Sequence, residues 1–155
     1  MQAERATTDG WRGNPLLLAN VLLGVIGMCL AGYLTYVHYN EDALVCTVGG
    51  CETVQQSDYS TMFGLPIAIF GFLMFLTVTL LALARMTDRG PLSSDMATMA
   101  AWTLLLTSLL YYAYLTYIEI WELEAVCQWC VMSSIVALLM FAIESVLLTR
   151  ELRTE

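Results

Sequence analysis

The stretch YSTMFGLPIAIFGFLMFLTVTLLALA, residues 59–84, contains no Asp, Glu, Lys or Arg. A helix of about 20 apolar residues, rising about 1.5 Å per residue, is long enough to cross a hydrocarbon core of about 30 Å. One charged residue at the bilayer centre costs about 2.5 to 3.5 kcal/mol, so an uncharged run of this length is typical of a transmembrane helix. The segment therefore indicates that the chain enters a membrane.

Three further segments lack the same four residue types, namely 13–37, 96–118 and 125–143. The first is longer than the apolar core of a signal peptide, which covers about 7 to 15 residues, so we expect it to be a retained span. The sequence thus predicts an all-α fold, an integral membrane four-helix bundle that forms a single domain over residues 1–155. The expected spans are about 15–37, 65–84, 96–118 and 126–148.

Composition agrees with a membrane protein and excludes two other classes. Hydrophobic residues make up 59% of the 155-residue chain and charged residues only 13%, against about 25% in ordinary soluble domains. The formal net charge is -8 and the chain has no Lys, so it lacks the basic clusters that bind nucleic acid. The apolar excess also excludes a disordered chain.

The basic residues predict the orientation of the bundle. All six fall before the first span, between the second and third, or after the fourth; they are Arg5, Arg12, Arg85, Arg89, Arg150 and Arg153. The other two connections, 38–58 and 119–124, carry acidic residues and no basic ones. By the positive-inside rule we expect a multi-pass protein of the cell membrane, with both termini and the 85–95 loop in the cytoplasm. The long loop between helices one and two then lies outside.

Four of the five cysteines form two close pairs on the predicted outer side. Cys46 and Cys51 lie in the long loop, and Cys127 and Cys130 lie where the fourth span begins. Thiols outside the cytoplasm tend to oxidise, which favours disulfide chemistry over a metal site. Two alternatives remain open at this point: a zinc site made of four thiolates, and a disulfide that only clips an exposed loop.

The second pair is a C-x-x-C sequence at the start of a helix, where the helix dipole lowers the pKa of a thiol. Nearby glutamates at 119, 122 and 124 would oppose that shift. Residues three apart share a helix face, so the two sulfurs can bond, and Cys130 lies deeper than Cys127. Since thiolate attack moves disulfides between pairs, the two pairs can act as a relay.

Three other features of the sequence, a fifth cysteine, a glutamate within the fourth span and the tyrosines, allow further predictions. Cys29 lies in the middle of the first span and is expected to be an inert buried thiol. Glu144 lies near the cytoplasmic end of the fourth span and is expected to reach water with its carboxylate. All eight tyrosines lie toward the outer ends of the first three spans, as an interfacial belt or as the lining of an aromatic pocket.

A thiol relay needs a final electron acceptor, and the sequence has no flavin, haem or nucleotide motif. The acceptor must therefore diffuse to the protein. For a deep thiol at a helix start within four spans, a lipid-soluble quinone is the natural candidate.

The arrangement of these motifs resembles the vitamin K epoxide reductase family. The resemblance is carried by the Cys46 and Cys51 pair, by Ser57, by the segment from Phe63-Gly64-Leu65-Pro66 to Phe70-Gly71, and by Cys127-x-x-Cys130. It covers about residues 15 to 148. Within the family, the chain more specifically resembles the bacterial and archaeal homologues, which use quinone to oxidise thioredoxin-like proteins outside the cytoplasm.

The resemblance implies a thiol:quinone oxidoreductase in which electrons pass from a thioredoxin-like partner to Cys46, then through a Cys51–Cys127 mixed disulfide, and from Cys130 to the quinone. The quinone, a ubiquinone, menaquinone or vitamin K, would contact Cys130, Ser57, Phe63 and Ser134. No metal is implied. Because 155 residues leave no room for a fused thioredoxin domain, the partner is expected to be a separate protein. Reduction of vitamin K epoxide is an alternative, although Ser60 and Ser134 replace the asparagine and tyrosine of the animal enzymes.

Overall fold

Four long helices dominate the computed structural model, which describes residues 14–47, 49–87 and 93–154. They are α2 (Pro15–Tyr39), α4 (Ile67–Thr87), α5 (Ser94–Trp121) and α6 (Gln128–Thr154). Each is long and apolar enough to cross a membrane. The prediction of an all-α, four-helix membrane bundle is confirmed, and the chain is a multi-pass membrane protein.

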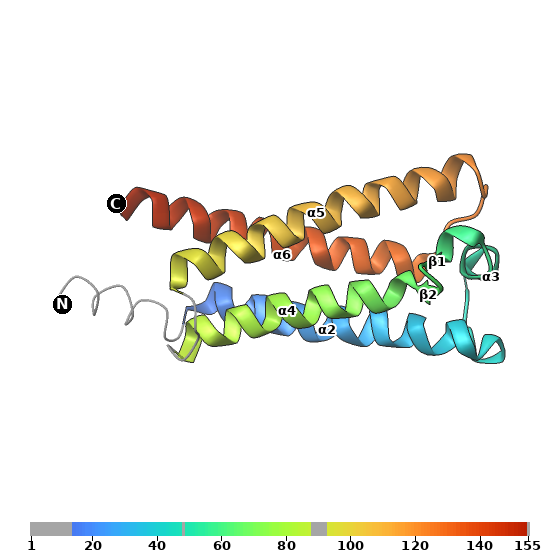
Figure 1. Ribbon diagram of the computed structural model, residues 1–155, viewed down its shortest axis with the longest axis horizontal. Helices are drawn as coiled ribbons and strands as arrows, with labels where there is room; N and C mark the ends of the chain where they lie inside the picture. The colour runs from blue at the N-terminus through green and yellow to red at the C-terminus, as the bar shows by residue number, and fades with distance from the viewer. Residues whose placement is uncertain (1–13, 48, 88–92, 155) are drawn as a thin grey trace.

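The helices lie side by side, with α2 packed on α4 and α6, and α5 packed on the same two helices (Figure 1). The start of α2, the end of α4, the start of α5 and the end of α6 share one end of the bundle. The opposite end carries the short elements that follow α2. These are a 3-10 turn (Glu41–Ala43), α3 (Cys51–Gln55), a second 3-10 turn (Asp58–Ser60), β1 (Thr61–Met62) and β2 (Leu65–Pro66).

β1 and β2 form a small antiparallel hairpin directly before α4, with Thr61 opposite Pro66 and Met62 opposite Leu65. Gly64, in the turn between the strands, has φ +79°, a conformation open to glycine at no steric cost. Pro66 has no N–H to donate, and α4 begins at the next residue. The hairpin therefore determines where the second span starts.

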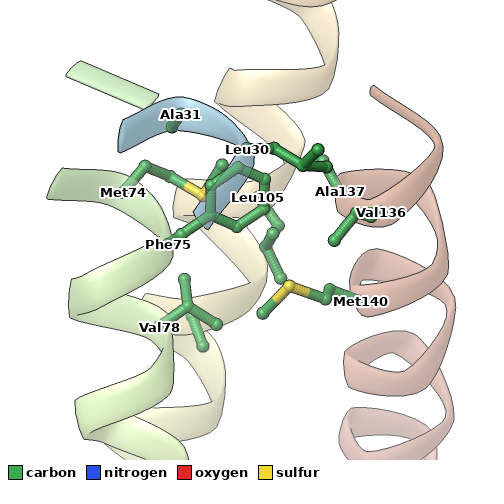
Figure 2. Packing of buried hydrophobic residues seen from close by; sticks show 10 residues of the cluster. Leu30, Ala31, Met74, Phe75, Val78, Leu105, Val136, Ala137 and Met140 are labelled. Atoms are coloured by element: carbon green, nitrogen blue, oxygen red, sulfur yellow. The ribbon is translucent and has the colours of Figure 1, made fainter. Parts of the chain in front are cut away.

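The core lies midway along the bundle and is made of aliphatic, methionine and aromatic side chains from all four helices (Figure 2). Phe75 of α4 is fully buried against α2 at Gly27. A Cβ at Gly27 would lie 2.5 Å from the Phe75 ring, so only glycine allows the two helices to approach this closely. Many large apolar side chains elsewhere on the helices point outward, as expected for surfaces that face lipid.

One expectation about a charged residue is wrong. Glu144 does not reach water: it is fully buried and pairs with Arg85, whose Nη1 donates to Glu144 Oε2 at 3.0 Å. Asn20 Nδ2 also donates to this carboxylate, and Arg85 Nη1 donates to Thr98 Oγ1 at 2.9 Å. The pairing allows both charges to stay inside the bundle.

Arg85 itself was expected in a cytoplasmic loop, but it lies within α4 and is only 4% exposed. Arg5, Arg12 and Arg89, which supported the predicted orientation, lie outside the described residues. Cys29 also differs from expectation, because it is exposed on the outer face of α2. A thiol is small and apolar enough to face lipid without a partner.

Candidate active site

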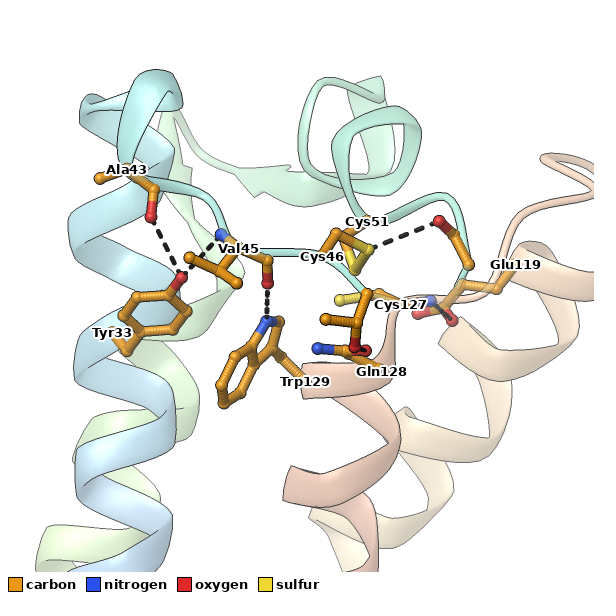
Figure 3. Close-up of a disulfide and its surroundings, with 11 residues drawn as sticks. Tyr33, Ala43, Val45, Cys46, Cys51, Glu119, Cys127, Gln128 and Trp129 are labelled. Carbon is orange, nitrogen blue, oxygen red and sulfur yellow. Dashed lines mark hydrogen bonds between the residues drawn. A yellow bond between two sulfur atoms is a disulfide. The ribbon is translucent and has the colours of Figure 1, made fainter.

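Cys46 and Cys51 form a disulfide at the end of the bundle that carries the short elements (Figure 3). Their Cα atoms are 6.0 Å apart. Cys46 is exposed to solvent, whereas Cys51, the first residue of α3, is fully buried. The disulfide thus has one sulfur at the surface and one in the interior.

The loop that carries Cys46 is fastened to two helices (Figure 3). The Tyr33 hydroxyl of α2 donates to Ala43 O at 3.1 Å and accepts from Val45 N at 3.0 Å. Trp129 Nε1 of α6 donates to Val45 O at 2.9 Å, and its ring lies 4.8 Å from that of Tyr33. These contacts hold the loop across this end of the bundle, next to the start of α6.

Two glycines allow the loop to lie directly against the segment before α6. Gly49 has φ +93°, and a Cβ there would lie 2.1 Å from Val126 O. A Cβ on Gly50 would lie 2.6 Å from the Cβ of Ala125. Such distances leave no space for a side chain, so the approach of the loop pair to the second pair depends on these glycines.

Cys51 and Cys127 belong to one buried cluster, together with Leu34 and Val37 of α2. Both are fully buried, and they lie beside one another in Figure 3. Cys127 is a free thiol. The inner sulfur of the loop disulfide and the first sulfur of C-x-x-C are therefore brought together, as the relay prediction requires.

Cys127 directly precedes α6, and its carbonyl accepts from Val131 N at 3.1 Å. Its own N–H donates to Glu119 Oε2 at 3.1 Å. A hydrogen bond from the Cys130 thiol lowers the pKa of Cys127, while burial and the charge of Glu119 oppose that shift. The direction agrees with the sequence-based expectation, but the largest cause is the neighbouring thiol.

Cys130, in the first turn of α6, lines a cavity of about 450 Å³ between the helices. Most of the wall is apolar, and the polar groups include Ser57, Tyr112 and Glu119. Pockets of about 300 to 1,000 Å³ with mostly apolar walls and a few polar groups are typical of small-molecule sites. The cavity therefore has the size and lining for an apolar ring compound beside the Cys130 thiol.

Only some of the residues predicted to contact a quinone line this cavity. Ser57 lines it, and its hydroxyl donates to Val54 O at 2.7 Å. Phe63 is 93% exposed in the hairpin turn and does not line it. Ser134 is also absent from the wall, and its hydroxyl donates to Val131 O at 2.7 Å. Its neighbour Ser133 faces the cavity instead, because successive helical residues point about 100° apart.

Sequence reasoning missed Glu119, which it placed in an acidic outer loop. The helix α5 continues through this residue, and Glu119 is 5% exposed on the cavity wall. A signal was present in the sequence: Ser108, Tyr112, Leu115 and Glu119 are spaced by three or four residues, so they share one helix face. All four line the cavity.

The tyrosines divide between the two roles that the sequence left open. Three of them, Tyr59, Tyr111 and Tyr112, line the cavity. Four others are exposed near the same end of the bundle, as an interfacial belt would be: Tyr36, Tyr39, Tyr114 and Tyr117.

A four-thiolate zinc site does not agree with the geometry, since Cys46 and Cys51 are bonded to each other. Within residues 14–47, 49–87 and 93–154, no group of three or more His, Cys, Asp or Glu side chains is arranged to hold a metal ion.

A second hollow, of about 560 Å³, opens beside Cys46 on the outer surface. Its lining includes Cys46, Glu52 and Asp58. It is more polar than the first cavity and adjoins the exposed sulfur of the loop disulfide.

Comparison with known proteins gives two findings. The sequence model of the vitamin K epoxide reductase family matches residues 18–145. The thiol-disulfide oxidoreductase LTO1 of Arabidopsis thaliana is 40% identical over 52 residues. The aligned part covers 32% of this chain and 14% of the length of LTO1.

Proposed function

Because the chain belongs to the vitamin K epoxide reductase family, we propose that it is a membrane thiol-disulfide oxidoreductase that passes electrons from a thiol protein to a quinone. The observation that carries the proposal is the order of the four sulfurs from solvent to cavity. Cys46 is exposed, Cys51 and Cys127 are buried together, and Cys130 lines the cavity.

The first step is exchange at the surface. A thiolate of the partner attacks Cys46, forms a mixed disulfide with it and releases Cys51 as a thiolate. The second thiol of the partner then attacks the mixed disulfide and displaces Cys46 as a thiolate. The partner leaves with its own two cysteines joined as a disulfide. Exposure of Cys46 beside the outer hollow supports this entry point. The partner we propose is a separate thioredoxin-like protein.

The second step moves the electron pair inward. The Cys51 thiolate attacks Cys127 of an oxidised inner pair, and Cys130 leaves as a thiolate. Cys46 then resolves the Cys51–Cys127 bond, which regenerates the loop disulfide and leaves Cys127 and Cys130 reduced. A bonded loop pair above two free inner thiols is the arrangement that this route passes through before quinone is reduced.

The quinone is the oxidising substrate, and the residues of the cavity fit it. The mostly apolar wall suits a hydrocarbon ring, and hydroxyl groups such as that of Ser57 can donate to carbonyl oxygens. We propose Cys130 and Ser57 as contacts of the quinone. Phe63 and Ser134 would need to move to reach it. The ring system can be that of ubiquinone, menaquinone or vitamin K.

We further propose that the bundle lies in the cell membrane with its four redox cysteines on the extracytoplasmic side. The acidic outer connections and the distribution of arginines support this orientation. Disulfide transfer is also favoured there, since cytosolic thiols are kept reduced. The transmembrane unit is proposed to act as one domain over residues 1–155.

The proposal is tested by mixing purified reduced protein with a soluble short-chain quinone, with and without reduced thioredoxin as the thiol donor. Quinol absorbance should rise with repeated turnover only when the donor is present, and Cys130→Ala should abolish it. Cys29→Ala is the matched control, because this thiol is exposed on the outer face of α2 and should be dispensable. A non-catalytic protein with a structural disulfide would show no donor-dependent turnover at all.

A further inference from the structure

Glu119 is a buried carboxylate that the route above does not use. It lies in the last turns of α5, is 5% exposed and faces the cavity beside Cys130. None of the ion pairs recorded for the described part of the chain involves it. A carboxylate in such surroundings is costly unless its hydrogen bonds compensate for lost hydration, so its position calls for a physical reason.

Both cysteines of the inner pair lie beside this carboxylate. Glu119 Oε2 accepts from Cys127 N at 3.1 Å, and Glu119 and Cys130 line the same cavity. The first contact is structural, since it satisfies a free N–H at the start of α6. An amide or hydroxyl would satisfy that N–H equally well. Within the shared cavity, the carboxylate is a base beside the thiol whose proton must leave.

We propose that Glu119 is a catalytic residue that accepts the Cys130 proton and passes it to the quinone oxygen in the cavity. The inference rests on the proposed function, which it deepens by assigning the proton path. The titratable groups that share the cavity with Glu119 are Tyr59, Tyr111, Tyr112 and Cys130, and Cys127 contacts it from the start of α6. The Cys127 thiolate is used in forming the new disulfide, so the carboxylate of Glu119, a type of group ordinarily ionised at neutral pH, remains to accept the proton.

The Cys127 thiolate, whose proton has gone to water outside, bonds to the Cys130 sulfur as two electrons leave the pair for the quinone. Glu119 takes the Cys130 proton and delivers it to one quinone oxygen, and the other oxygen takes a proton from water. Two thiols become one disulfide, the quinone becomes a quinol, and Glu119 ends as the carboxylate it was at the start.

The decisive variant is Glu119→Gln, because the amide oxygen can still accept from Cys127 N but is not a base. Glu122→Gln is the matched control, since Glu122 lies three residues further on and is exposed. Glu119→Asp retains the carboxylate on a shorter arm. All four proteins are fully reduced, freed of reductant and mixed with a short-chain ubiquinone in a single turnover. General acid–base groups contribute about 10² to 10⁴-fold, so a loss of at least about 10²-fold is expected in Glu119→Gln.

The aspartate variant should retain part of the activity, and the Glu122→Gln control all of it. Two further measurements use no quinone. Reduction of the Cys46–Cys51 disulfide by dithiothreitol should be unchanged in Glu119→Gln. Alkylation of Cys130 by a small maleimide should be at least as fast as in the unaltered protein, because an amide carries no negative charge that opposes thiolate formation.

Three outcomes overturn the proposal, and they differ from one another. A Glu119→Gln protein that reduces quinone at the unaltered rate shows that Glu119 carries no proton. A variant in which quinone reduction, loop reduction and alkylation all fall together shows a structural role. If the unaltered reduced protein fails to reduce quinone, the proposed function is wrong, and the proton path falls with it.

Discussion

In the proposed route, the depth of each sulfur sets the order in which the four cysteines react. Cys46 is open to solvent, and Cys51 is buried against Cys127. The pKa of Cys127 is lowered by the Cys130 thiol, which makes Cys127 a good leaving group when Cys46 resolves the Cys51–Cys127 bond. Burial of both Cys51 and Cys127 would keep an intermediate between them away from competing thiols.

The first prediction concerns that intermediate. In a protein carrying Cys46→Ala and Cys130→Ala, neither resolving thiol remains, so mild oxidation should trap a Cys51–Cys127 disulfide. Peptide mapping after digestion without reductant would detect the cross-linked peptides. The matched control carries Cys51→Ala and Cys130→Ala, where the remaining Cys46 is exposed and should cross-link to Cys127 far less. Equal yields in the two proteins would contradict the assigned order.

The spacing of the cysteines was enough to predict two cysteine pairs at one end of the bundle, but not which other side chains contact them. Glu119 was assigned to a loop because a charge ended the uncharged run, whereas in the structure the helix continues through it. Ser134 and Ser133 differ by one helical position, and only the packed bundle decides which of them faces the cavity. Contacts of this kind depend on how each helix is rotated about its own axis. A segment that is hydrophobic on all sides does not specify that rotation.

At the scale of elements, the loop that carries the disulfide is held at its distance from α6 by glycine. Gly49 combines a positive φ with an approach that a Cβ would prevent. Gly64 also has a positive φ, +79°, but nothing lies within 4 Å of the position a Cβ would take. A substitution at Gly64 therefore tests backbone strain alone, whereas one at Gly49 tests backbone strain together with close approach to the segment before α6.

The second prediction uses that pair. Gly49→Ala should slow electron transfer from the loop pair to the inner pair by at least about tenfold, because the displaced loop separates Cys51 from Cys127. Both Gly49→Ala and Gly64→Ala carry a backbone strain of roughly 1 to 3 kcal/mol, so both should lower thermal stability. Only the first should lose thioredoxin-dependent quinol formation. Equal activity in the two variants would show that close approach at Gly49 is not needed.

The ends of the helices show what a charge pattern can and cannot indicate. Ending the second span before Arg85 and the third before Glu119 located four helices correctly but made two of them too short, since α4 includes Arg85 and α5 includes Glu119. A charge interrupts a span only when it must face lipid. Here the charged groups face the bundle, where Arg85 and Glu144 pair and Glu119 accepts a hydrogen bond from Cys127 N.

On the scale of the whole molecule, polar groups lie at both ends of an apolar core. At the end opposite the cysteines, the Arg85–Glu144 pair joins four helices, with Asn20 from α2 and Thr98 from α5 bound to it. Removing one partner of a buried ion pair leaves an uncompensated charge and costs about 3 to 5 kcal/mol, whereas replacing both by apolar residues is often neutral.

The third prediction is therefore that Arg85→Met lowers the unfolding temperature in detergent strongly, while Arg85→Met combined with Glu144→Met recovers most of the loss. Arg150→Met, at an exposed position of α6, is the control and should behave like the unaltered protein. The cysteines proposed to carry electrons lie at the other end of the bundle, so the folded double variant should still reduce quinone in a single turnover. A stable double variant without that activity would instead mean that the buried pair takes part in the reaction, and the two ends of the molecule could no longer be treated as independent.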